Sequence, residues 1–186
     1  MEPKIYLIRH GKTAGNLKKQ YIGSTDESLC EEGLCEIMEK AAEGYYPSAD
    51  VVVSSPMKRA VETARLIYPD REPVIIGEFR EMDFGRYEGT TFEENQNDPS
   101  YMAWVEGGGK GDFPDGETAA EFSTRVAKGW ERLLMLSGER KTLAVITHGG
   151  VIMELLHRAH PEEAEGTSFR FRIENGEWLE YPGKSV

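Results

Sequence analysis

The sequence predicts an α/β protein, a three-layer α/β/α sandwich with a mostly parallel central sheet. Two observations lead to this prediction: short apolar runs alternate with longer amphipathic segments along the chain, and one of these runs is β-branched. Alternating strands and helices are typical of a parallel sheet that is covered on both faces. The length of 186 residues fits a single domain over residues 1–186.

The expected strands are short apolar runs at Lys4–Ile8, Asp50–Ser54, Pro73–Ile76 and Thr142–Thr147. The second contains Val51-Val52-Val53, a run suited to a strand that is buried on both faces. Near the end of the chain, Ser168–Ile173 and Glu177–Tyr181 alternate like a hairpin around the turn signal Asn175-Gly176.

Three expected helices have apolar residues along one face: Glu31–Ala42, Pro56–Tyr68 and Glu117–Leu136. A fourth helix is expected over Val151–Arg158, after the last of the parallel strands. Ser28 and Glu31 have the spacing of a capping box for the first helix. That helix is expected to bury Leu34, Ile37, Met38, Ala41 and Ala42. Pro56 is favourable in the first turn of the second helix, because its missing N–H has no partner there in any case. The segment from Asp83 to Gly116 is expected to be irregular, with a lid-like part at about residues 88–115.

Composition excludes several classes of partner. The chain has 22 basic and 33 acidic residues, a formal net charge of −11, which argues against nucleic acid and anionic membranes as partners. No apolar run approaches the ~20 residues of a membrane span, and the first apolar stretch is too short for a signal peptide. Cys30 and Cys35 are expected to be reduced thiols, which indicates a cytoplasmic protein. The oligomeric state is left open.

Polar side chains follow three of the expected strands. They occur in Arg9-His10-Gly11, in Ser54-Ser55 leading to Arg59, and in Thr147-His148-Gly149. The carboxyl ends of parallel strands form one edge of a sheet, so these residues are expected to converge. Arginine binds tetrahedral oxyanions through two N–H groups, and the combination of two arginines with two histidines therefore predicts a phosphate pocket.

The chemistry open to this pocket is nucleophilic attack on phosphorus. A neutral His10 can form a phosphohistidine, and neighbouring cations would lower its pKa and keep it neutral. A carboxyl group must then protonate the leaving oxygen, and Glu81 and Glu117 are the candidates. His157 and His160 are expected to be structural. No group of residues has metal-ligand spacing, so neither a metal nor another cofactor is expected.

Four segments resemble the signature motifs of the histidine phosphatase superfamily, the phosphoglycerate mutase-like proteins. They are Leu7–Asn16, which contains Arg9-His10-Gly11, Ser54–Ala64, which contains Ser54-Ser55-Pro56 and Arg59, Glu81–Gly89, and Thr147-His148-Gly149-Gly150. The motifs occur in the family's order and span most of the chain.

The resemblance implies a role for each matching residue. His10 would be the phosphorylated nucleophile, with Arg9, Arg59 and His148 holding the phosphoryl oxygens. Asn16 and the Gly149 backbone N–H would add hydrogen bonds. Glu81 would be the general acid and then activate water, which leaves Glu117 as a supporting or substrate-facing residue. The family needs no metal.

Within the family, the chain is most similar to the small α-ribazole-5′-phosphate and broad-specificity phosphatases. The expected function is hydrolysis of a small phosphorylated metabolite, with α-ribazole 5′-phosphate of cobalamin assembly as a candidate. A cofactor-dependent phosphoglycerate mutase and a non-catalytic phosphate-binding module are the alternatives. Two residues depart from the pattern: Tyr87 replaces a usual Trp, and Cys30 a usual Thr. Tyr101, Trp104 and Phe113 could contact a substrate ring, but packing within the lid-like segment is favoured.

Overall fold

A five-stranded sheet forms the centre of the molecule, with strand order β3-β2-β4-β1-β5. The computed structural model describes residues 3–108, 111–137, 141–161 and 171–182. The strands are β1 (Lys4–Arg9), β2 (Val51–Ser54), β3 (Val74–Ile75), β4 (Thr142–Thr147) and β5 (Trp178–Tyr181). Strands β1 to β4 pair in parallel, and β5 runs antiparallel to β1. The mostly parallel sheet expected from the sequence is thereby confirmed.

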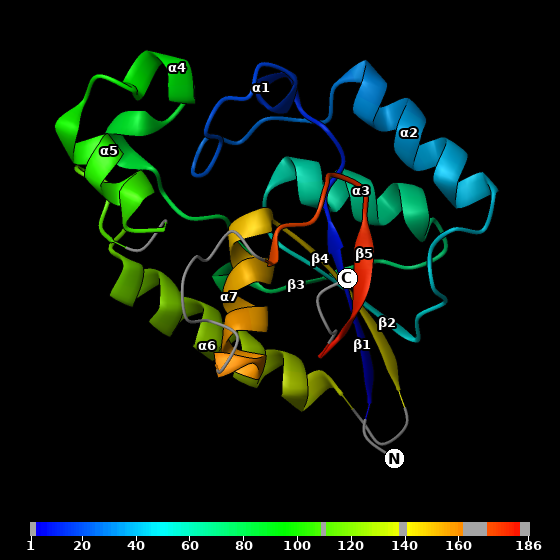
Figure 1. Ribbon diagram of the computed structural model, residues 1–186. Helices are drawn as coiled ribbons and strands as arrows, with labels where there is room; N and C mark the ends of the chain where they lie inside the picture. The colour runs from blue at the N-terminus through cyan, green and yellow to red at the C-terminus, as the bar shows by residue number, and fades with distance from the viewer. Residues whose placement is uncertain (1–2, 109–110, 138–140, 162–170, 183–186) are drawn as a thin grey trace.

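Helices cover both faces of this sheet, as Figure 1 shows. The α-helices are α1 (Ala14–Leu17), α2 (Glu31–Ala42), α3 (Lys58–Ile67), α4 (Phe92–Asn95), α5 (Pro99–Glu106), α6 (Ala119–Leu136) and α7 (Gly149–Ala159). Two 3₁₀ turns, η1 (Gly77–Phe79) and η2 (Gly85–Tyr87), follow β3. Helices α2 and α3 pack together, as do α6 and α7. In Figure 1, α1, α4 and α5 lie at the top of the view, toward the end of β1.

Each of the two faces of the sheet packs against helices in a separate apolar cluster. Leu7, Val53 and Val145 belong to the cluster that includes Val126 of α6 and Ile152 of α7. The alternate positions, among them Ile8, Val52 and Ile146, pack instead with Ala60 and Ala64 of α3. Successive side chains of a strand point to opposite faces, so burial on both sides explains why these strands are apolar throughout.

The buried face of α2 differs from the expected one. The helix has the expected bounds, but Leu34 and Met38 are exposed, and Gly33 and Ile37 are its buried residues. A Cβ on Gly33 would lie 2.2 Å from the Lys12 carbonyl oxygen, so this helix approaches the chain after β1 through its glycine. The expected cap is also wrong, because Cys30 is the N-cap and its Sγ accepts a hydrogen bond from Gly33 N at 3.4 Å.

Two other local expectations need correction. Pro56 lies before α3 rather than in its first turn, since Met57 is the N-cap and the helix begins at Lys58. Residues 171–173 form no strand and β5 pairs with β1, so the described part of the tail is not a hairpin. The remainder of the expected first hairpin strand, residues 168–170, lies outside the described residues. The turn at Asn175-Gly176 is present, with Gly176 at φ +73°.

The segment expected to be irregular contains η2, α4 and α5. Thr91 and Glu94 form a capping box for α4, and Asp98 caps α5 with Pro99 in its first turn. Tyr101, Phe113 and Tyr87 are buried together, with Trp104 packed against them. The Tyr87 hydroxyl donates to Asp98 Oδ2 at 3.1 Å. These aromatic side chains therefore pack against one another, as the favoured alternative expected.

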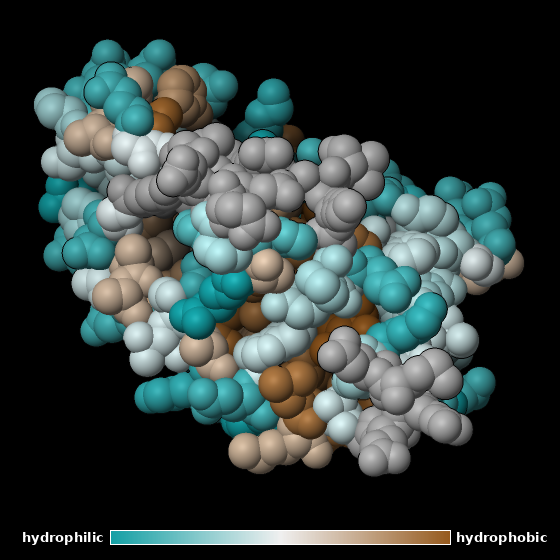
Figure 2. All heavy atoms as spheres, turned by 60° about the horizontal axis from the view of Figure 1, so that its bottom comes forward, coloured by the Kyte–Doolittle hydropathy of each residue, from teal (hydrophilic) through white to brown (hydrophobic). Residues whose placement is uncertain are grey.

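The space-filling view in Figure 2 shows hydrophilic side chains around the periphery of one face, with apolar atoms visible nearer its middle. Among the described residues, none of the helices has the length and apolar character needed to cross a bilayer.

Candidate active site

The carboxyl ends of β1 and β4 bring two histidines together. Arg9 and Thr147 are register partners at the ends of these adjacent strands, so His10 and His148 follow at the same level. The His10 backbone N–H donates to the Thr147 carbonyl at 3.0 Å, and the two imidazole centroids lie 5.1 Å apart. Both side chains are buried.

The tautomer of His10 follows from one hydrogen bond. Its Nδ1 lies 2.7 Å from the Gly11 carbonyl oxygen, which can only accept, so Nδ1 carries the proton. Burial, and then the charges of Arg59 and Arg9, hold the pKa of His10 well below its usual range. A neutral imidazole protonated at Nδ1 has its lone pair on Nε2. His10 therefore has the form of a nucleophile.

His148 has the opposite arrangement. Its Nε2 lies 2.7 Å from the Ser55 hydroxyl, which also accepts a hydrogen bond from Met57 N. Burial lowers the pKa of His148 strongly, with the charge of Arg59 adding to the effect. Among the described residues, Nε2 is the acceptor available to the Ser55 proton, and we infer from this that Nδ1 carries the ring proton. That buried Nδ1 has no hydrogen-bond partner among the described residues.

One buried arginine, Arg59, and one partly buried arginine, Arg9, lie beside the histidines. Arg59, from the first turn of α3, is fully buried and donates to the carbonyls of Ile22, Gly23 and Thr25. Arg9 donates from Nη1 to the Ile173 carbonyl at 2.7 Å. The Nε atoms of both arginines are buried without a partner among the described residues. Burial lowers the pKa of both guanidinium groups, yet arginine stays charged in proteins. Buried cations with unused donors favour an anion beside them.

The Glu81 carboxyl lies at the beginning of α7, close enough to Arg59 and Arg9 to interact with their charges. Its Oε2 accepts from Gly150 N at 3.0 Å and its Oε1 from Met82 N at 2.9 Å. Burial raises the pKa of Glu81, against the effect of these two hydrogen bonds and of Arg59 and Arg9. A carboxyl group with a raised pKa can hold a proton and donate it.

Asn16 and Gly149 lie at the edge of this cluster. Asn16 Oδ1 accepts from Thr13 N and from Asn175 Nδ2, and the same Asn175 amide donates to the His10 carbonyl at 3.0 Å. Gly149 is the first residue of α7, where backbone N–H groups have no partner within the helix. A Cβ there would lie 3.4 Å from Arg9 Cζ, so the arginine packs against this glycine.

The structure adds residues that the sequence analysis did not assign. Ser55 binds the His148 ring and so fixes its orientation. The position of Ser55 directly after an expected strand could have indicated such a role. Glu88 accepts hydrogen bonds from the backbone N–H groups of Gly23, Ser24 and Thr25, and so fixes the loop whose carbonyls bind Arg59. Nothing in the sequence pattern identifies Asn175 or Glu88 as neighbours of these loops.

Arg125 binds both carboxylate oxygens of Glu117, which agrees with the supporting role among the two that the sequence left open for this residue. Within the described ranges, no group of three or more His, Cys, Asp or Glu residues is placed to hold a metal ion.

Comparison with known proteins points to one family. Residues 5–182 match the model of the histidine phosphatase superfamily, branch 1. An adenosylcobalamin/alpha-ribazole phosphatase of Escherichia coli is 32% identical over 179 residues, covering 94% of this chain and 87% of the relative.

Solved structures give the same result. The alpha-ribazole phosphatase of Shigella flexneri is similar with a TM-score of 0.80 and 29% identity, covering 95% of this chain and 89% of that chain. A phosphoglycerate mutase of Thermus thermophilus is similar with a TM-score of 0.74 and 28% identity, covering 98% and 96%.

Proposed function

The chain belongs to the histidine phosphatase superfamily and is a phosphatase, and we propose that it is a metal-independent phosphomonoesterase that acts through a phosphohistidine at His10. The observation that supports this most directly is the state of the His10 ring. Its proton is held at Nδ1 by Gly11, and its lowered pKa keeps a lone pair at Nε2.

In the first step, Nε2 of His10 attacks phosphorus, a P–N bond forms and the P–O bond to the leaving group breaks. Glu81, with its raised pKa, donates its proton to the leaving oxygen. The charge on the phosphoryl oxygens is stabilised by the unused donors of Arg9, Arg59 and His148. The Gly149 N–H and the Asn16 amide nitrogen are further donors at the edge of the site.

In the second step, the Glu81 carboxylate takes a proton from water, and the water oxygen attacks phosphorus. The P–N bond breaks, phosphate leaves and Glu81 is again protonated. The arginine charges supply the electrostatic stabilisation in both steps, which is why we propose that no metal ion takes part.

The proposed substrate is a small phosphorylated metabolite, and α-ribazole 5′-phosphate is the first candidate. It is supported by the 32% identity with the Escherichia coli adenosylcobalamin/alpha-ribazole phosphatase. The cytoplasm is the proposed location, supported by the free thiols of Cys30 and Cys35. We propose residues 1–186 as one domain, with the segment at about 88–115 as its lid.

The test is phosphate release from p-nitrophenyl phosphate, α-ribazole 5′-phosphate and 3-phosphoglycerate in EDTA. We expect release by the intact protein and a loss of at least about 1,000-fold in His10→Ala. His157→Ala, on the far turn of α7, is the matched control and should keep its activity. Acid-labile labelling of the intact protein, but not of His10→Ala, would identify the phosphohistidine.

The likeness to the Thermus thermophilus phosphoglycerate mutase supports a second candidate. A mutase would transfer the phosphoryl group to a phosphoglycerate after priming by bisphosphoglycerate. Interconversion of 2- and 3-phosphoglycerate faster than phosphate release would favour it over the phosphatase.

A further inference from the structure

Glu117 and Arg125 form a largely buried ion pair next to the segment that carries Glu81. Arg125 Nε lies 2.7 Å from Glu117 Oε1, and Nη2 lies 2.5 Å from Oε2. The two side chains are 10% and 9% exposed. A two-point contact fixes the plane of the guanidinium as well as its position.

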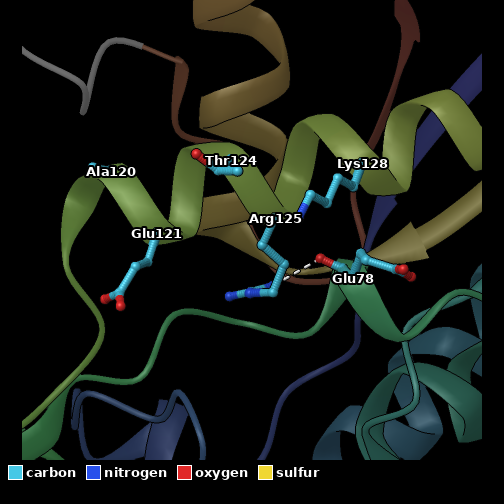
Figure 3. A pocket seen from close by; sticks show the side chains of 6 residues that line it. All are labelled: Glu78, Ala120, Glu121, Thr124, Arg125 and Lys128. Carbon is cyan, nitrogen blue, oxygen red and sulfur yellow. Dashed lines mark hydrogen bonds between the residues drawn. The ribbon is translucent and has the colours of Figure 1, made fainter.

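The remaining N–H groups of Arg125 all reach backbone carbonyls of one short segment. Nη1 donates to the carbonyls of Glu78 at 2.7 Å and Arg80 at 2.8 Å, and Nη2 donates to that of Glu81 at 3.4 Å. Figure 3 shows Arg125 directed from α6 toward Glu78, along an open hollow of about 530 Å³. All five donors of the guanidinium are therefore used, and none remains for a ligand.

The segment that Arg125 binds has little support of its own. The 3₁₀ turn η1 ends at Phe79, and Arg80 is extended with φ −61° and ψ 156°. The carbonyl of Phe79 points the other way, to the Thr147 hydroxyl at 2.9 Å. Side-chain donors thus hold all four carbonyls from residue 78 to residue 81, and Arg125 holds three of them.

We propose that Arg125, oriented by Glu117, is a positioning residue that sets the place of the Glu81 carboxyl relative to the reacting phosphoryl group. The proposal rests on the proposed function, in which Glu81 is the general acid. The Glu81 carboxyl is held at one side by Gly150 N, and its backbone is held at the other side by Arg125. A displaced carboxyl would protonate the leaving oxygen poorly while the nucleophile and the arginines remain in place.

The test compares two leaving groups. p-Nitrophenolate leaves with little help from an acid, whereas an alkoxide from an alkyl phosphate needs a proton. We expect Arg125→Met to lower kcat/KM about 100-fold for an alkyl phosphate and about 3-fold for p-nitrophenyl phosphate, since misplacement of a reacting group by 1 Å has effects of this size. Arg132 lies on the same helix as Arg125 and forms a surface ion pair with Glu78. Arg132→Met is therefore the control, and it should leave kcat/KM unchanged for both substrates.

A Glu81→Gln background separates positioning from general damage. In that background, adding Arg125→Met should lower kcat/KM for the alkyl phosphate almost no further. An equal loss on both substrates, or a loss that multiplies with that of Glu81→Gln, would overturn the positioning role. If Arg125→Met does not fold, Glu117→Gln is the second variant. It weakens the contact that orients Arg125 and should show the same leaving-group dependence.

The same data distinguish this proposal from the one on which it rests. If Glu81→Gln itself affects both leaving groups equally, Glu81 is not the acid, and both its role in the proposed function and the positioning role of Arg125 are wrong. If Glu81→Gln depends on the leaving group but the Arg125 and Glu117 variants do not, only the positioning role is wrong.

Discussion

The two histidines of the site differ in which ring nitrogen carries the proton. His10 is fixed through Nδ1 by a carbonyl, and His148 through Nε2 by the Ser55 hydroxyl. One ring therefore offers a lone pair and the other an N–H donor. The motifs predicted both histidines, but the tautomers could not be predicted, because they depend on where Gly11 O and Ser55 Oγ lie after folding.

Ser55→Ala tests the tautomer of His148. Without the hydroxyl, no group fixes the proton at Nδ1, and we expect kcat/KM to fall about 10-fold, the size of one net hydrogen bond. The measurement is steady-state hydrolysis of p-nitrophenyl phosphate, with ¹⁵N NMR of the imidazole to read the tautomer. Ser54→Ala is the matched control, since that buried hydroxyl donates only to the Ser55 carbonyl. An unchanged His148 spectrum in Ser55→Ala would contradict the assignment.

At the scale of the elements, α2 shows why periodicity predicts a helix better than its orientation. The apolar pattern gave the correct bounds, but it placed Leu34 and Met38 inward. The close approach of Gly33 to the Lys12 carbonyl turns Ile37 to the core instead. A pattern based on side-chain hydropathy gives no weight to a glycine that lets two backbones meet. The short helices α4 and α5 were missed for a related reason, because their caps are clear but neither is long enough to show a period.

Alanine substitutions on α2 check this orientation. Ile37 is 1% exposed and Met38 is 56% exposed. We expect Ile37→Ala to lower the free energy of unfolding by about 2–5 kcal/mol and Met38→Ala by less than about 0.5 kcal/mol. Urea unfolding at pH 7 measures both. Equal losses of unfolding free energy, or a larger loss for Met38→Ala, would instead support the orientation that the sequence pattern predicted, with Met38 buried.

The first turn of α7 allows activity and stability to be separated. A Cβ on Gly150 would lie 2.4 Å from Glu81 Oε1, so Gly150→Ala must displace that carboxyl. Alanine also favours the helix over glycine by up to about 1 kcal/mol. We therefore expect kcat/KM for an alkyl phosphate to fall about 10-fold or more, with thermal stability nearly unchanged. Gly77→Ala, where nothing lies within 4 Å of the new Cβ, is the control. Full activity in Gly150→Ala would mean that Glu81 needs no fixed position.

At the scale of the whole molecule, burial of the site makes folding depend on pH. His10 and His148 have lowered pKa values, so below about pH 6.5 the unfolded chain binds protons that the native protein does not. Their contribution to stability is therefore lost as the pH falls through that value. The raised pKa of Glu81 acts in the opposite direction, because the native protein holds a proton that the unfolded chain loses above about pH 4.5.

We expect the free energy of unfolding to decrease from pH 7 to pH 5, with each buried histidine contributing up to about 1.4 kcal/mol per pH unit. Urea denaturation at the two values measures it. His10→Ala should show a smaller decrease than the wild type, and Glu81→Gln a larger one. The reverse order of the two variants would show that these groups do not govern the dependence.

Residues far apart in the sequence meet at Arg9 and His10. Gly176 N donates to the carbonyls of Arg9 and His10, Ile173 O accepts from Arg9 Nη1, and Glu177 O accepts from Arg9 N. Arg9 and His10 are thus synthesised well before the residues that hold them, since Ile173 follows Arg9 by 164 residues. A nascent chain has no complete site until residue 177 has left the exit tunnel, so we expect no activity while the residues between 10 and 177 are being synthesised. Chains that end before residue 173 would lack these contacts, and we expect them to be inactive even where strands β1 to β4 had formed.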